Sequence, residues 1–199
     1  MKVLFASSEA YPFAMSGGLA DVAGALPKAL RKRLVGCRIV MPLYSCIPDE
    51  LREKMSFICS ITVSVAWRRQ YCGIFEAHMD GVIYYFIDNQ YYFKRDGIYG
   101  HYDDAERFAF FSRAVLEIIP HIDFKPDIIH AHDWQSGMVP ALLKIQYAHL
   151  PFYSKIKTVF TIHNLQYQGI FGIKEVQDVL GLGDGLWSSD KLECYGCAN

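Results

Sequence analysis

The chain has 199 residues, of which 52% are hydrophobic, so it can bury the core of one full domain. Its 20 basic and 21 acidic residues nearly balance, and the formal net charge of −1 argues against both a nucleic-acid-binding surface and an acidic disordered arm. The first residues, MKVLFASSEAYPF, lack the apolar run of a secretory signal, and no stretch reaches the roughly twenty apolar residues of a membrane span. We therefore expect a cytoplasmic protein that forms a single domain over residues 1–199.

Six cysteines occur in a chain without an export signal, so free thiols are expected. Cys194 and Cys197 have the CxxC spacing, but no second pair lies at the distance typical of a zinc site. We interpret this pair as incidental to function.

The first third of the chain predicts a β-α-β unit. Residues 2–6 form a short aliphatic run that suits a buried parallel strand, and residues 37–43 read as the next one. Between them, a turn rich in glycine precedes apolar residues at helical spacing from Leu19 onward. Gly24 and Pro27 interrupt that spacing, which predicts a kinked helix or two short helices.

The middle of the chain changes character. Residues 57–89 contain three strand-like runs linked by turn signals, which predicts a β-meander inserted into the α/β domain. A helix capped by Asp103 or Asp104 should follow and end at Pro120.

The α/β rhythm returns after this helix. Strands are predicted at residues 127–131 and 158–162, with a helix over 134–147 between them, and a loop-rich tail over 172–199. The fold class is therefore α/β: a Rossmann-like three-layer domain with a mostly parallel sheet.

Three polar clusters follow predicted parallel strands, where open α/β sheets place their ligands. The first is the run Ser16–Asp21 (SGGLAD). Gly17 and Gly18 allow the backbone to approach a ligand, and the helix that follows offers free N–H groups. The alternative is a tight strand-to-helix turn, with Asp21 as a carboxylate that complements the helix dipole.

The second cluster is His130-Ala-His132-Asp133-Trp134. Strand alternation places both histidines on one face and leaves Asp133 at the strand exit. These residues are either hydrogen-bonded core histidines with a helix-capping Asp133, or ligands of a metal ion.

The third cluster is Thr161-Ile-His163-Asn164-Leu165. His163 and Asn164 leave a strand end and can bind hydroxyls or orient a developing charge, or they belong to a structured polar loop. Three polar clusters at three strand ends together indicate a polyhydroxylated ligand.

These stretches, in this order, resemble the glycogen/starch synthases. The resemblance rests on five blocks that run from the first residues to Phe171: SSEAYPFAMSGGLADVAGALPKAL, RIVMPLY, DGIYGHYDDAERFAFFSRAVLE, PDIIHAHDWQSGMVPALL and KTVFTIHNLQYQGIF. The tail KLECYGCAN is similar to the segment before the family's next helix.

The resemblance implies the N-terminal half of a GT-B fold, in which two Rossmann-like domains face a cleft and no metal or other cofactor is required. It implies transfer of glucose from ADP-glucose to the non-reducing end of an α-1,4-glucan with retention. Asp133 and His163 match positions that contact the transferred glucose and support its developing charge. The loop that faces the donor is matched by Gly17, Gly18 and Asp21, and Asn164 and Tyr99 would lie near the donor sugar or the acceptor.

Two departures from the family pattern matter. The lysine that neutralises donor phosphate in the family's KTGGLADV signature aligns with Met15, whose thioether supplies no charge. The C-terminal domain, which holds most of the nucleotide pocket in this family, is absent from these 199 residues. We therefore expect the chain alone to be inactive.

Three other functions remain open from the residues alone. One is a glucan-acceptor-binding module without transferase activity. Another is a metal-dependent hydrolase that uses His130, His132 and Asp133. A nicotinamide-dependent dehydrogenase is disfavoured because the Ser16–Gly24 stretch lacks the glycine spacing of a dinucleotide site.

Overall fold

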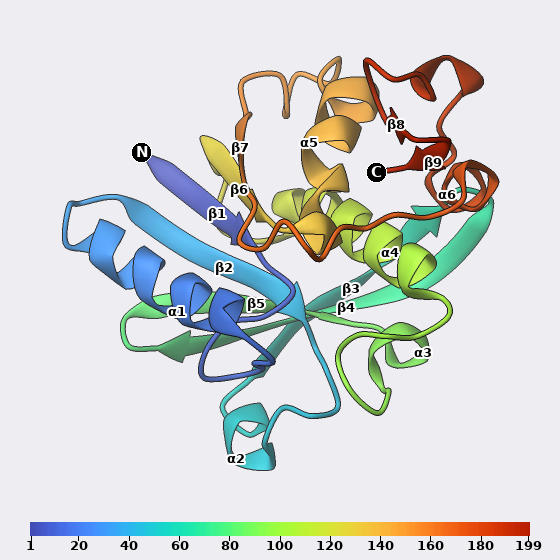
Figure 1. Ribbon diagram of the computed structural model, residues 1–199. Coiled ribbons are helices and arrows are strands. Elements are labelled where there is room, and N and C mark those ends of the chain that lie inside the picture. The colour runs from blue at the N-terminus through green and yellow to red at the C-terminus, as the bar shows by residue number, and fades with distance from the viewer.

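A computed structural model describes all residues 1–199, which form a seven-stranded sheet with helices on both faces (Figure 1). The strands are β1 (Lys2–Ala6), β2 (Gly36–Pro42), β3 (Ser56–Val65), β4 (Arg68–Met79), β5 (Val82–Asp88), β6 (Ile128–His132) and β7 (Lys157–Thr161), with β8 (Glu193–Cys194) and β9 (Cys197–Ala198) in a separate hairpin. The helices are α1 (Gly18–Arg31), α2 (Asp49–Arg52), α3 (Gln90–Phe93), α4 (Asp104–Glu117), α5 (Met138–Leu142) and α6 (Ile173–Leu180).

The sheet order is β3-β4-β5-β2-β1-β6-β7. The pairs β5–β2, β2–β1, β1–β6 and β6–β7 are parallel, whereas β3–β4 and β4–β5 are antiparallel. The chain thus moves outward from β1 to β2 and β5, then returns past β1 to β6 and β7. Crossovers that run in opposite directions from β1 put α1 on one face of the sheet and α4 and α5 on the other (Figure 1). The predicted α/β class with a mostly parallel sheet is confirmed.

The central strands are buried because helices cover both of their faces. β1 is exposed only at its first residue, and five of the seven residues of β2, including its last four, are buried. Residues buried on both faces explain why these strands read as uninterrupted apolar runs. No helix in the protein is both long and apolar enough to span a bilayer.

Helix α1 is one helix, so the alternative of two short helices is wrong. It runs without a break from Gly18 to Arg31, with Pro27 inside it. Gly24 has a packing role, since a Cβ there would lie 2.8 Å from the carbonyl oxygen of Tyr11. The glycine that interrupts the apolar pattern therefore lets the loop after β1 pack against the helix.

The segment between β6 and β7 is less regular than the single helix predicted over residues 134–147. It contains a 3₁₀ turn (Trp134–Ser136), the short helix α5 and one π-helical stretch (Leu143–Tyr147). Gly137 and Pro140 lie at the start of α5, where the backbone changes from 3₁₀ to α-helical hydrogen bonding.

The tail over residues 172–199 contains a helix that the sequence prediction missed. α6 begins after Gly172 and ends at Gly181, which adopts the left-handed conformation (φ 63°) common at helix C-termini. Its apolar face, with Val176, Val179 and Leu180, is buried. Cys194 and Cys197 are free thiols that face each other across the β8–β9 hairpin.

Candidate functional site

A polar cleft opens where β1, β6 and β7 end, at the point where the chain path reverses across the sheet. Its volume is about 880 Å³. The cleft is lined by Glu9, Ser16, Gly17, Gly18, Leu19, Tyr99, Gly100, Asp104, Asp133, Trp134, Gln135, His163, Asn164, Gln166, Tyr167 and Gln168. The structure therefore brings all three predicted polar clusters to one cavity.

Asp133 leaves β6 in a backbone conformation that few residues with a side chain adopt, with φ 54° and ψ 177°. Two bonds to β7 and its exit hold this conformation. The Asp133 backbone N–H donates to the Thr161 carbonyl (2.9 Å), and the His163 backbone N–H donates to Asp133 Oδ1 (2.6 Å). Asp133 occupies the N-cap position of the following 3₁₀ turn, as one of the two alternatives proposed, but its carboxylate makes no capping bond there and accepts from the His163 backbone N–H.

Three histidines lie behind Asp133. His130 and His132 share one face of β6, as predicted, with ring centroids 4.1 Å apart. His132 Nδ1 lies 2.9 Å from His163 Nε2, and His130 Nε2 lies 2.7 Å from Thr161 Oγ1. Burial, followed by the neighbouring imidazoles, lowers the pKa of His132 to about 3. The pKa of His130 is lowered by burial and by His163, so both rings are neutral at pH 7.

The glycine loop is held by a carboxylate that sequence reasoning missed. Glu9 is 3% exposed and accepts hydrogen bonds from Ser16 N–H, Ser16 Oγ (2.8 Å), Gly17 N–H (3.3 Å) and Tyr99 Oη (2.6 Å). The strand-end rule that selected Asp133 and His163 also applies to Glu9, which follows β1 by three residues.

Gly17 and Gly18 are not required by packing. A Cβ at either position would meet no atom within 4 Å, and neither residue has a positive φ. Tight turns that demand glycine show one of these two constraints. The open space beyond both Cα atoms is the cleft itself, which leaves the backbone accessible to a ligand.

Tyr99 and Asn164 also line the cleft. The Tyr99 hydroxyl is already engaged by Glu9 and by Ser8 Oγ (2.7 Å), and burial raises the pKa of Tyr99 so that it stays protonated. Asn164 is exposed, and its Oδ1 accepts from the Gln166 N–H (2.9 Å) while its amide nitrogen is free. Tyr99 thus supports the loop, and Asn164 offers a donor to the cavity.

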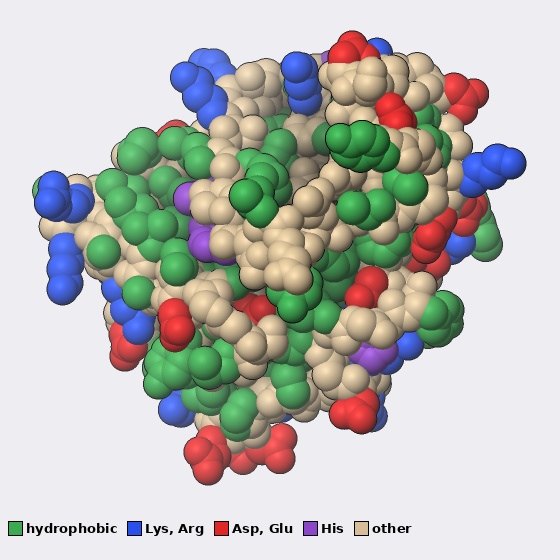
Figure 2. Space-filling model, in the orientation of Figure 1, with side chains coloured by type: hydrophobic (Ala, Val, Ile, Leu, Met, Phe, Trp, Pro, Cys, Tyr) green, Lys and Arg blue, Asp and Glu red, His purple; other side chains and the backbone are tan.

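Two predicted site residues lie outside the cleft lining. Asp21 is exposed in the first turn of α1, and Met15 is 55% exposed before the glycine loop. No Lys or Arg lines the cleft. Figure 2 shows the basic side chains mainly toward the margin of the face in view. The cleft therefore presents carboxylates, amides and hydroxyls but no cation for a phosphate.

The histidines do not form a metal centre in this geometry. They stack on one another and on Phe5, whose ring lies 5.4 Å from that of His132. No group of three His, Cys, Asp or Glu side chains in the structure is arranged to hold a metal ion.

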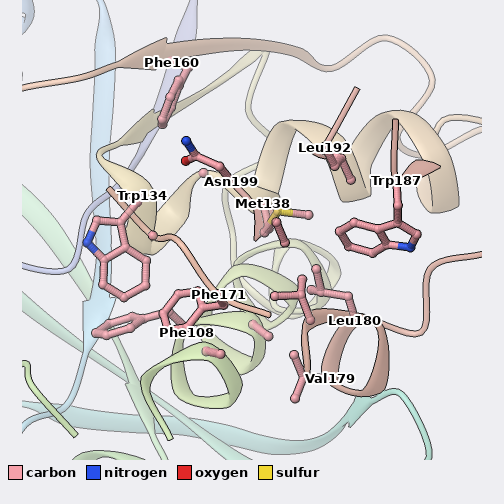
Figure 3. A pocket seen from close by; sticks show the side chains of 16 residues that line it. Phe108, Trp134, Met138, Phe160, Phe171, Val179, Leu180, Trp187, Leu192 and Asn199 are labelled. Atoms are coloured by element: carbon pink, nitrogen blue, oxygen red, sulfur yellow. The ribbon is translucent and has the colours of Figure 1, made fainter. Parts of the chain in front are cut away.

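A second, apolar pocket of about 210 Å³ lies beside the cleft, between α4, α5, α6 and β7 (Figure 3). Trp134 lines both cavities, and in Figure 3 it lies with Phe108 and Phe171 on one side of the pocket, opposite Trp187. A Cβ on Gly169 would lie 2.5 Å from Trp134 Cε3, so the Trp134 ring packs directly on that glycine. The apolar pocket offers few hydrogen bonds, and the polar cleft is the better candidate for a functional site.

The fold and the cleft define a doubly wound α/β domain with a ligand site at the carboxyl ends of its strands. Residues 2–199 match the family model described as the starch synthase catalytic domain, and the chain belongs to this family.

Relatives and one solved structure agree. Glycogen synthase from Geobacillus thermodenitrificans is 58% identical over all 199 residues, and glycogen synthase from Bacillus cereus is 56% identical over the same length. The catalytic domain of Starch Synthase IV from Arabidopsis thaliana, solved with ADP and acarbose bound, superposes with a TM-score of 0.89 at 32% identity over 96% of this chain and 39% of that one. The chain spans 41% of the length of the Geobacillus relative.

Proposed function

We propose that this chain is the N-terminal domain of a glycogen synthase that transfers glucose from ADP-glucose to the non-reducing end of an α-1,4-glucan with retention. The observation that carries the proposal is the pairing of Asp133 with His163 in the lining of a polar cleft, in a chain similar to glycogen synthases. Support for the substrates comes from the Arabidopsis relative, which was bound to ADP and acarbose.

The proposed roles follow from the chemistry of the cleft. As the bond between glucose and nucleotide breaks, positive charge develops on the sugar, and a fixed carboxylate stabilises that charge best when water is excluded. Asp133 supplies this carboxylate, which the backbone N–H of His163 holds in place. His163 contacts the transferred glucose, Asn164 and Tyr99 lie near the sugars, and the Gly17–Gly18 backbone faces the donor. Asp21 lies outside the cleft lining, and we assign it no contact with the donor.

The cleft also indicates what a second domain must supply. The donor phosphates become more negative as they leave, and stabilising that charge is a large catalytic contribution. No basic side chain lines the cleft, and Met15 stands where the family signature has lysine. We propose that the nucleotide pocket and its basic residues belong to a C-terminal domain, and that these 199 residues alone are inactive.

Calorimetry and turnover test the proposal. The isolated chain should bind maltotriose weakly and show no glucosyl transfer from ADP-glucose. Transfer by the chain alone would overturn the division of labour between two domains. Binding of maltotriose by a full-length parent that turns over no nucleotide sugar would instead favour an acceptor-binding module.

In the full-length parent enzyme, Asp133→Asn removes the charge and keeps the shape. Loss of one electrostatic group at a charged transition state costs on the order of 10²–10³ in kcat. The matched control is Glu53→Gln, an exposed carboxylate outside the cleft, which should leave kcat unchanged. Equal rates for Asp133→Asn and the parent would refute the assigned role.

A further inference from the structure

The buried His132 has no assigned role in the proposed mechanism, although it lies between the core and His163. The ring is fully buried, and its Nδ1 faces His163 Nε2 at 2.9 Å. Its backbone is fixed by Ser136, whose hydroxyl lies 2.7 Å from the His132 N–H and 2.8 Å from its carbonyl. The ring is thus held by its hydrogen bond to His163 and by packing against the rings of His130 and Phe5.

Hydrogen-bond accounting restricts where the protons lie. Between His132 Nδ1 and His163 Nε2 there is one proton, because two N–H groups or two lone pairs would repel at this distance. His132 Nε2 is buried and has no hydrogen-bond partner. Burial also keeps His132 neutral, as its lowered pKa indicates, so the ring carries a single N–H.

Two arrangements remain. In one, His163 Nε2–H donates to His132, and the single N–H of His132 is then on Nε2, buried without an acceptor. In the other, His132 Nδ1–H donates to His163, and Nε2 keeps only an unshared lone pair. Buried N–H groups without an acceptor are rarer in proteins than acceptors without a donor, so the second arrangement is favoured.

We propose that His132 is a positioning residue that holds His163 as the Nδ1–H tautomer, so that His163 presents a neutral N–H donor to the cleft. With Nε2 occupied as an acceptor, the ring proton of His163 must be on Nδ1. His163 lines the cleft, where a ligand oxygen accepts this hydrogen bond. The nature of that ligand rests on the proposed function; the tautomer does not.

Nitrogen-15 NMR of histidine side chains tests the tautomer directly in the 199-residue chain, without any ligand. At pH 7.5 we expect His163 Nε2 to show the shift of an acceptor nitrogen and Nδ1 that of a protonated one; His132 should likewise be protonated on Nδ1, with an unprotonated Nε2. A protonated Nε2 on His163 would overturn the proposal. Because this measurement uses the unaltered chain, it stands whether or not sugar binding is found.

Two variants separate positioning from packing. Asparagine places an amide N–H near the position of His132 Nδ1, so His132→Asn should keep the His163 tautomer. His132→Phe preserves the ring volume but removes the donor, and His163 should then shift toward the Nε2–H form that a free imidazole side chain prefers. Unchanged His163 shifts in His132→Phe would refute the role of His132.

Ligand affinity gives the second reading. Loss of one neutral hydrogen bond corresponds to about a 3- to 10-fold weaker affinity, measured in the full-length parent with maltotriose and with ADP-glucose. We expect this loss in His132→Phe and not in His132→Asn. Equal losses in both folded variants would mean that His132 acts through packing alone. A parent that binds neither sugar would count against the proposed function and leave the tautomer result intact.

Discussion

Asp133 has a backbone conformation that favours glycine, yet its carboxylate is the centre of the proposed site. Residues with a Cβ in this part of φ/ψ space carry about 1–3 kcal/mol of strain, which the surrounding structure must offset. Here the backbone hydrogen bonds that join Asp133 to Thr161 and to His163 offset this strain. Strain of this kind concentrates at functional sites, where a side chain must point in a direction that relaxed backbone does not permit.

A comparison of two substitutions measures this strain. Neither Asp133→Gly nor Asp133→Ala keeps the carboxylate, so they differ only in the Cβ. Glycine normally lowers the free energy of unfolding by about 0.4–1 kcal/mol relative to alanine, because it makes the unfolded chain more flexible. At position 133 glycine also relieves the backbone strain, which is the larger effect. Asp133→Gly should therefore be more stable than Asp133→Ala by about 1 kcal/mol in urea unfolding. At Asp49, in the first turn of α2, the same pair should show the opposite order. If the alanine variant were more stable than the glycine variant at both positions, the backbone of Asp133 would not be strained.

His132 makes stability depend on pH. Its folded pKa of about 3 lies below the unfolded value of roughly 6.5, so the unfolded chain binds the proton first and stability falls as the pH falls below about 6.5. Between pH 7 and pH 5 this amounts to about 2 kcal/mol, and His130, whose pKa is also lowered, acts in the same direction. His132→Asn should flatten the curve of unfolding free energy against pH over this range. If the curves of unfolding free energy against pH were parallel for the unaltered chain and His132→Asn, His132 would not contribute to the pH dependence of stability.

At the scale of elements, the sequence predicts best where both faces of a strand are covered. β1 has the predicted bounds because its side chains are buried whichever way they point. The segment between β6 and β7 was predicted as one helix because its apolar spacing is helical, and periodicity does not distinguish α from 3₁₀ or π geometry. α6 was missed because Gly181, Gly183 and Gly185 suggested a loop, although Gly181 is the C-terminal cap of that helix.

Part of the functional site could also be predicted from the sequence. Asp133 and His163 could be found because parallel strand ends converge, which is a property of the fold class. Glu9 also follows a strand end and could have been found by the same rule, whereas Gln166 and Gln168 line the cleft through the path of the loop after β7, which sequence spacing does not contain. The exposed position of Asp21, outside the cleft lining, likewise depends on the rotation of α1.

The contact of Gly169 with Trp134 joins the loop after β7 to the turn after β6. Gly169→Ala would place a Cβ 2.5 Å from the indole, and the indole is rigid, so the ring or the loop must move. We expect a loss of about 1–3 kcal/mol in the free energy of unfolding and a change in Trp134 fluorescence. Gly183→Ala, where no atom lies within 4 Å and φ is negative, is the control and should change neither. A Gly169→Ala chain as stable as the control would mean that the loop yields without cost.

At the scale of the whole molecule, the sheet has one open edge beside the functional cleft. Lys157 N–H donates to Asp127 and Thr161 carbonyl accepts from Asp133, so the alternate peptide groups of β7, at Thr158 and Phe160, face away from β6. Four of the five β7 residues are exposed, including the apolar Val159 and Phe160. The strand predicted over residues 158–162 is thus present, one residue earlier in the chain, and its apolar residues lie at an uncovered edge.

An exposed, apolar edge strand is a template for pairing with another strand, and natural edges are often protected by lysine. We therefore expect the 199-residue chain to associate with itself in a concentration-dependent way, measured by light scattering. Val159→Lys places a charge on the 44% exposed edge position and should reduce this association several-fold, because pairing would bring two like charges together. Val22→Lys adds the same charge at a 37% exposed site on α1, away from the edge, and should leave the scattering largely unchanged. Equal scattering from both variants would show that the chain associates through net charge or another surface and that β7 pairing does not drive it.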